Sequence, residues 1–197
     1  MNTQSKDTLA NMTPEKALNL LKEGNQRFVS KKKEQRDLLE QVAQTSAGQY
    51  PFAVVLGCVD SRVPLELVFD LGIGDIFGVR IAGNISNEDI LGSMEFATKV
   101  VGSKHILVLG HTSCGAVKGA YDAVELGNLT GLVNKIKPAV EAVGPGGSVD
   151  EIAQKNVELT IEEILHNSPI LKEMVDQGEI GISGGMYDVS TGKVTFL

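Results

Sequence analysis

Two short segments hold the side chains of this sequence that are best suited to metal chemistry. The first, Cys58–Arg62, reads Cys-Val-Asp-Ser-Arg, and the second, His111–Cys114, reads His-Thr-Ser-Cys. The chain has only two cysteines, one in each segment. Two thiolates and one neutral imidazole form a zinc ligand set, and three protein ligands leave a fourth position open for catalysis. The residue types therefore predict a catalytic zinc site made by Cys58, His111 and Cys114.

Each segment follows an apolar run that predicts a buried strand. Residues 52–56 precede Cys58, and residues 106–109 precede His111. Strands that alternate with helical patterns indicate a parallel sheet with helices on its faces. Ligands of such sheets bind beyond the carboxyl ends of the strands, which is where both segments fall. We therefore expect the two segments to share one site.

The chain as a whole predicts an α/β fold with a central, mostly parallel β-sheet flanked by helices. We expect a single domain over residues 13–197, preceded by a flexible N-terminal tail over residues 1–12. Amphipathic helices from Pro14 and over residues 34–45 come before the first strand. We predict that these N-terminal helices pack on a partner subunit, although packing on their own domain is equally physical. The expected C-terminal strands cover residues 180–182, 186–189 and 194–196.

Composition excludes several classes of protein. A net charge of -7 and a pI near 5.0 disfavour nucleic acid as a partner, because phosphate binding requires a basic surface. No stretch reaches the roughly 18 apolar residues of a membrane span. The polar N-terminus lacks the apolar core of a secretory signal, so we expect a cytoplasmic protein that does not bind membranes.

Taken singly, these residues have simpler interpretations. A lone cysteine is more often a buried structural thiol, and His111 alone could be a satisfied polar side chain. Asp60 and Arg62 could form a loop salt bridge without a chemical role, although an arginine beside a carboxylate also keeps it ionised and oriented. The combination at two strand ends favours a metal site over these alternatives.

The motifs together resemble those of the β-class carbonic anhydrases. The resemblance lies in Cys-x-Asp-x-Arg at residues 58–62 and His-x-x-Cys-Gly at residues 111–115. Residues 74–84, Gly-Asp-Ile-Phe-Gly-Val-Arg-Ile-Ala-Gly-Asn, are similar to a second signature of that family. The match extends from about Pro14 to the C-terminus.

This resemblance implies a zinc lyase that catalyses the reversible hydration of CO₂ to bicarbonate and a proton, by attack of zinc-bound hydroxide. It implies Zn²⁺ on Cys58, His111 and Cys114, and a homodimer or homotetramer. It assigns Asp60 and Arg62 as the neighbouring catalytic pair.

The resemblance also places two of these residues in more specific roles. In a closed form known for some members, Asp60 would become a fourth metal ligand. Gln49 matches a glutamine that, in part of the family, binds substrate across the dimer interface. By composition alone, Gln49 is an ordinary polar residue of a loop.

Three other functions fit parts of the sequence. Relatives with similar ligands act on CS₂ or COS, which the sequence does not separate from CO₂. A redox or metal sensor could form a reversible disulfide between Cys58 and Cys114. A nucleotide-binding domain could use the glycine-rich turn at residues 110–115, but neither a G-x-G-x-x-G fingerprint nor a P-loop is present.

Overall fold

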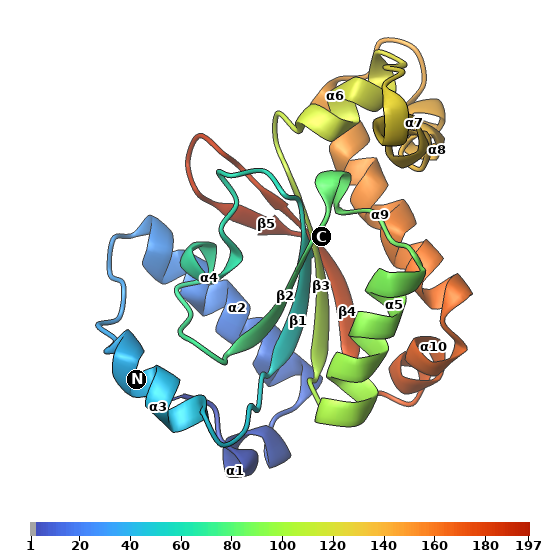
Figure 1. The fold of residues 1–197 in the computed structure, drawn as a ribbon. Coiled ribbons are helices and arrows are strands. Elements are labelled where there is room, and N and C mark those ends of the chain that lie inside the picture. The colour runs from blue at the N-terminus through green and yellow to red at the C-terminus, as the bar shows by residue number, and fades with distance from the viewer. Residues whose placement is uncertain (1–2) are drawn as a thin grey trace.

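A five-stranded sheet forms the centre of the computed structural model, which describes residues 3–197 (Figure 1). The strand order is β2-β1-β3-β4-β5. The first four strands are parallel, and β5 pairs antiparallel with β4. This arrangement confirms the predicted mostly parallel α/β fold. The strands are β1 (Ala53–Gly57), β2 (Ile76–Arg80), β3 (His105–His111), β4 (Gly181–Tyr187) and β5 (Val194–Phe196).

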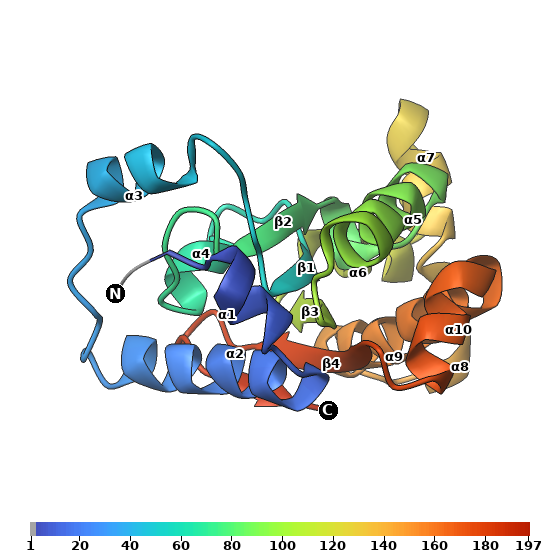
Figure 2. The same ribbon diagram turned by 90° about the horizontal axis from the view of Figure 1, so that it is seen from below.

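Helices cover both faces of the sheet and one of its ends (Figures 1 and 2). α2 and α4 pack on one face, and α5, α9 and α10 pack on the other. α6, α7 and α8 lie beyond the carboxyl ends of the strands. The helices are α1 (Lys6–Ala10), α2 (Pro14–Val29), α3 (Leu38–Thr45), α4 (Leu65–Val68), α5 (Glu88–Glu95), α6 (Gly115–Tyr121), α7 (Gly127–Asn134), α8 (Lys137–Val143), α9 (Val149–Asn167) and α10 (Pro169–Asp176), with a 3₁₀ turn η1 (Ala82–Asn84) and a π-helical turn η2 (Phe96–Val101). In the described part of the chain, no helix combines the length and apolar composition needed to cross a bilayer.

The sheet is buried on both faces because successive side chains of its central strands point to opposite layers. Val54 packs with α5, α9 and α10, while its neighbour Val55 packs with α2 and α4. β4 is a single strand where the sequence predicts two, because Gly184 lies within the ladder rather than in a turn. A Cβ atom at Gly184 would lie 2.7 Å from the Val157 side chain, so glycine here permits the close approach of α9.

In the N-terminal region, α2 adopts the own-domain packing that the sequence left open, and two other features differ from the prediction. α2 packs on its own sheet, where Ala17 and Leu21 are fully buried, because that face of the strands would otherwise be exposed. The predicted tail contains helix α1, which buries Leu9. α3 begins later than predicted, since the Asp37 side chain accepts hydrogen bonds from the first backbone N–H groups of the helix.

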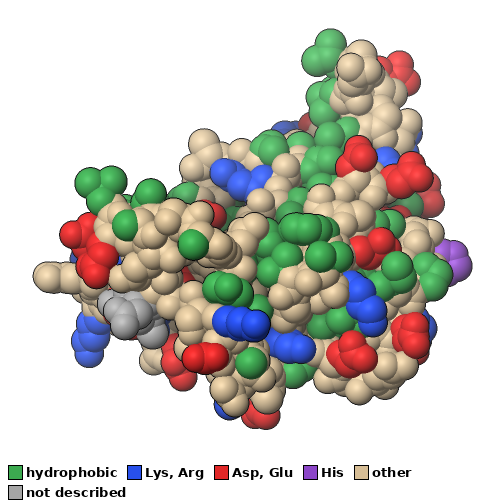
Figure 3. All heavy atoms as spheres, turned by 60° about the horizontal axis from the view of Figure 1, so that its bottom comes forward, with side chains coloured by type: hydrophobic (Ala, Val, Ile, Leu, Met, Phe, Trp, Pro, Cys, Tyr) green, Lys and Arg blue, Asp and Glu red, His purple; other side chains and the backbone are tan. Residues whose placement is uncertain are grey.

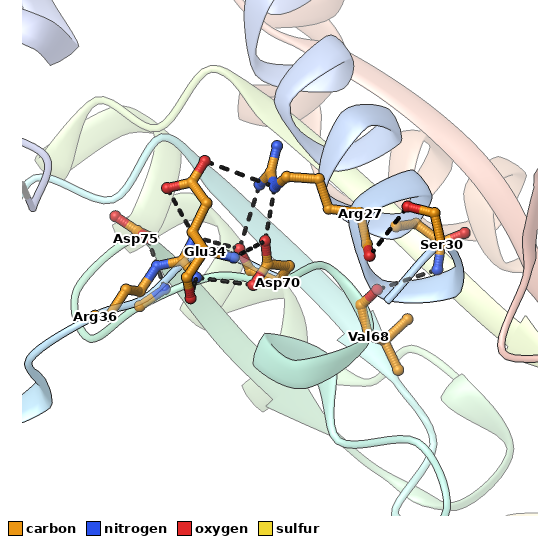
Figure 4. Close-up of polar contacts among 9 residues, drawn as sticks. Arg27, Ser30, Glu34, Arg36, Val68, Asp70 and Asp75 are labelled. Carbon is orange, nitrogen blue, oxygen red and sulfur yellow. Dashed lines mark hydrogen bonds and ion pairs between the residues drawn. The ribbon is translucent and has the colours of Figure 1, made fainter. Parts of the chain in front are cut away.

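A buried carboxylate ties the link between α2 and α3 to the core (Figure 4). Asp70 accepts hydrogen bonds from Arg27 Nε at 2.6 Å and from Arg36 Nη1 at 2.8 Å. The backbone N–H of Glu34 donates to the same carboxylate at 3.2 Å. Burial raises the pKa of Asp70, but the hydrogen bonds from Arg27 and Arg36 outweigh it, so the net pKa lies below its usual range.

Asp70→Asn is expected to lower the free energy of unfolding at pH 7 by about 2–3 kcal/mol, because the buried Arg36 guanidinium loses the nearer of its two counter-charges and keeps only Glu34 at 3.6 Å. Asparagine tolerates the left-handed backbone of this position, where φ is 46°, so the substitution adds no backbone strain to the loss of the charge and of one hydrogen-bond acceptor. The depressed pKa means that Asp70 stabilises the fold above its unfolded pKa of about 4 and loses that contribution as the pH falls through its folded value.

Urea unfolding of both proteins at pH 7 and pH 3.5 measures this effect. The difference between them should shrink at the lower pH, and an equal difference at both values would contradict the role of the charge. Asp122→Asn, which removes an exposed ion pair with Lys118 within α6 and its C-cap, serves as the control and should change stability little.

Candidate metal centre

Two adjacent parallel strands bring the three predicted ligands together. Gly57 at the end of β1 is in register with Leu109 of β3, so both strands end at the same edge of the sheet. Cys58 follows β1 directly, His111 is the last residue of β3, and Cys114 precedes α6. The ligand atoms of Cys58, His111 and Cys114 all lie within 4.8 Å of one another, and the three residues are 3%, 0% and 1% exposed.

The orientation of His111 suits a metal. Its Nδ1 lies 2.9 Å from the Thr112 carbonyl oxygen, so this nitrogen carries the proton and donates to the carbonyl. Its Nε2 is buried and has no hydrogen-bond partner. A buried nitrogen that is left unpaired is costly, and a metal ion beside the two cysteine sulfurs would satisfy it.

The two thiols differ in their tendency to ionise. The hydrogen bond from Cys114 lowers the pKa of Cys58 despite burial, and His111 and the backbone N–H of Gly83 add to this effect. The Gly83 nitrogen lies 3.3 Å from the Cys58 sulfur. The same contact with Cys58, together with burial, raises the pKa of Cys114. Cys58 is therefore the thiol of the pair that ionises more readily, and a bound cation would favour the ionised form of both.

Asp60 and Arg62 form a two-pronged ion pair at the mouth of this centre. Arg62 Nε and Nη2 donate to the two carboxylate oxygens at 3.0 and 2.8 Å. The contact with Arg62 lowers the pKa of Asp60 well below its usual range. Asp60 Oδ2 lies 3.8 Å from His111 Nε2, so an ionised carboxylate faces the ligand atoms while it stays paired with Arg62.

Two residues outside the predicted set hold the Cys58–Asp60 segment in place. Arg80 Nε donates to the carbonyl oxygen of Cys58 at 2.9 Å, and its Nη2 donates to that of Asp60 at 2.6 Å. Gly83 adopts φ of 71°, and a Cβ atom there would lie 2.5 Å from the Ile136 side chain. Both lie in the glycine-rich stretch at residues 74–84. That motif could have drawn attention to them, but spacing alone does not show what they contact.

Gln49 lies apart from this centre within its own chain. It is exposed and precedes β1, whereas Cys58 follows the same strand. A five-residue strand spans roughly 16 Å, so Gln49 is at the opposite edge of the sheet from the ligands. The structure thus brings all the predicted site residues together at one edge of the sheet, except Gln49.

Fold and site together define an α/β protein with a buried Cys₂His group, suited to bind a metal ion, at the carboxyl edge of its sheet. The carbonic anhydrase family profile matches residues 53–194. The chain is 37% identical over 195 residues to carbonic anhydrase 2 of Mycobacterium tuberculosis, a match that covers 94% of this chain and 93% of the relative. It is 35% identical to the carbonic anhydrase of Mycolicibacterium smegmatis, with 94% of each chain covered.

Solved structures agree with these sequence matches. The β-carbonic anhydrase CafA of Aspergillus fumigatus superposes with a TM-score of 0.73 at 30% identity, with 81% of each chain covered. A tetrameric β-carbonic anhydrase of Sordaria macrospora gives a TM-score of 0.70 at 26% identity, covering 80% of this chain and 89% of the other. The chain belongs to the β-class carbonic anhydrase family, and it is an enzyme of that class.

Proposed function

We propose that this enzyme uses Zn²⁺ held by Cys58, His111 and Cys114 to hydrate CO₂ reversibly. One observation carries the choice of site: the unpaired, buried Nε2 of His111 converges with two buried cysteine sulfurs. Two sulfur ligands and one imidazole favour zinc over magnesium or calcium, which prefer oxygen ligands. When bound, the zinc ion supplies an activated water as the nucleophile.

The remaining residues act on the position and charge of the reacting groups. We assign Asp60 as the hydrogen-bond acceptor that orients the nucleophile toward CO₂. Arg62 keeps this carboxylate ionised and holds it beside the metal centre rather than in it, as its 2.8 Å contact supports. Arg80 secures the backbone on which both Cys58 and Asp60 lie.

Zinc-quantified protein should hydrate CO₂ in a stopped-flow assay, with activity that increases from neutral to alkaline pH. Cys58 and Cys114 bring two negative charges to the centre, where a three-histidine site brings none. This added charge disfavours ionisation of the nucleophile at neutral pH. An activity already flat and maximal at pH 6 would contradict this argument.

The same assay separates CO₂ hydration from the alternatives. Near one zinc per chain with no hydration at either pH, together with turnover of CS₂ or COS, would overturn the proposed substrate. Zinc lost on mild oxidation with no turnover of any of these substrates would instead favour the sensor. The cytoplasmic location stays a prediction from the sequence.

We also propose that the enzyme is a homodimer or homotetramer. α3 exposes three large apolar side chains, Leu38, Leu39 and Val42, which are 53%, 81% and 49% exposed. Figure 3 shows further hydrophobic side chains gathered near the middle of the face that it brings forward. Apolar surface of this kind is typical of an interface. Gln49 follows α3 closely in the chain. A partner subunit that covers α3 would therefore lie next to Gln49, which could then reach the active site of that partner.

Light scattering should therefore give a mass of two or four times the 21.0 kDa of one chain. A mass of 21.0 kDa at micromolar concentration would exclude the assembly.

A further inference from the structure

The turn that joins His111 to Cys114 contains a residue in an unfavourable backbone conformation. Ser113 has φ of 54°, in the left-handed region that glycine adopts freely and serine rarely does. Such a conformation persists only when surrounding contacts hold it. Because Ser113 directly precedes Cys114 and lies two residues after His111, its backbone sets the separation of those two side chains.

Side chains from two other parts of the chain hold both peptide groups of Ser113. The Ser113 N–H donates to Asp150 Oδ1 at 2.7 Å. The Ser113 carbonyl oxygen accepts a hydrogen bond from Arg62 Nη2 at 3.3 Å, and Arg62 also binds the carboxylate of Asp60. A continuous path of hydrogen bonds thus connects Asp150 through Ser113 and Arg62 to Asp60.

The anchor itself is rigidly placed. Asp150 lies in the first turn of α9, a 19-residue helix whose start is fixed by a capping box between Ser148 and Glu151. A carboxylate is favourable near a helix N-terminus, and its hydrogen bond to a backbone N–H is charge-assisted. α9 also packs along β3 and β4, so its position is set by the core rather than by the turn.

We infer that Asp150 is a positioning residue that holds the His111–Cys114 turn in its metal-binding conformation. This inference rests on the proposed metal site, which it extends to a residue 36 positions beyond the last ligand in the sequence. The Asp150 carboxylate accepts a hydrogen bond from Ser113 rather than from a ligand residue. It acts through Ser113, whose left-handed conformation it stabilises.

The test is a double-mutant cycle on the full-length enzyme: wild type, Asp150→Ala, Ser113→Gly and the double variant. Zinc affinity is measured by competition with a chelator, and the absorption spectrum of the cobalt-substituted protein reports ligand geometry. Asp150→Ala should weaken zinc binding about tenfold, as loss of a contact that orients a ligand commonly does. In the Ser113→Gly background the same change should cost less than about threefold, since glycine needs no help to keep φ positive.

Asp89→Ala is the matched control, because Asp89 occupies the same position in α5 that Asp150 occupies in α9. It removes a first-turn acid without touching the turn, so zinc affinity should stay at the wild-type value. Far-UV circular dichroism verifies that each variant is folded. If Asp150→Ala does not fold, Asp150→Ser replaces it, because the shorter side chain also loses the contact with the Ser113 N–H.

Three outcomes would overturn the inference. If Asp150→Ala binds zinc as tightly as Asp89→Ala, the turn does not depend on Asp150. An equal loss in the serine and glycine backgrounds would mean that Asp150 acts by some route other than the conformation of Ser113. Failure of the wild type to bind zinc would remove the proposed metal site together with this inference, and only in that case is the proposed function at fault.

Discussion

Cys114→Ala is expected to abolish tight zinc binding and to reduce CO₂ hydration at least about a thousandfold, because the activated nucleophile depends on the metal. Cys114 is 1% exposed and supplies one of three convergent ligand atoms, so its removal leaves only Cys58 and His111 of the Cys₂His set. The loss should also appear in stability, since the free energy of metal binding contributes to the free energy of folding.

Zinc content after gel filtration and thermal unfolding with and without added zinc measure both effects. Cys114→Ser is the informative companion, since serine keeps nearly the same volume but is a poor zinc ligand. It should lose zinc as the alanine variant does while leaving a smaller cavity, so any stability difference between the two variants reports packing. A Cys114→Ala protein that keeps one zinc per chain and full activity would exclude Cys114 as a ligand.

Asp60→Asn has the second-largest expected effect, and it should separate turnover from metal binding. The variant should retain zinc but lose activity by about 10²–10³-fold, within the range typical of a positioned acid–base group. Asparagine presents an NH₂ donor where the carboxylate offers only acceptors, and it lacks the charge that pairs with Arg62 at 2.8 Å. The variant should therefore orient the nucleophile poorly and hold Arg62 less firmly in place.

Stopped-flow hydration with parallel zinc analysis tests this assignment. Ser61 is exposed and lies between the two residues of the ion pair. Ser61→Ala therefore controls for general disturbance of this segment, and its activity should stay near the wild-type value. Full activity in Asp60→Asn would contradict the role assigned to Asp60. Loss of zinc together with activity would show that the carboxylate supports the metal centre rather than the reaction.

Local sequence pattern is enough to locate most of this site. Apolar runs before Cys58 and His111 predict buried parallel strands, and such strands end at a common edge because their hydrogen-bonded register aligns them. Thiol and imidazole side chains at that edge then have few chemical uses other than binding a metal. The same reasoning accounts for the adjacent ion pair, since Asp60 and Arg62 are two residues apart on one segment. These features follow from the types and spacing of residues that are close in sequence.

Tertiary structure decides what depends on distant partners. α2 has the same amphipathic pattern whether it covers its own sheet or another subunit, and only the packing of Ala17 and Leu21 shows that it covers its own. Gly184 falls between two strands predicted from the sequence, and only its close contact with Val157 of α9 explains a glycine inside one continuous strand. The contact between Asp150 and Ser113 joins residues 37 positions apart, and no spacing rule connects a helix N-terminus to a turn across that distance. Periodicity and residue type report on neighbours along the chain, whereas the final placement of the ligands depends on contacts that exist only after the chain has folded.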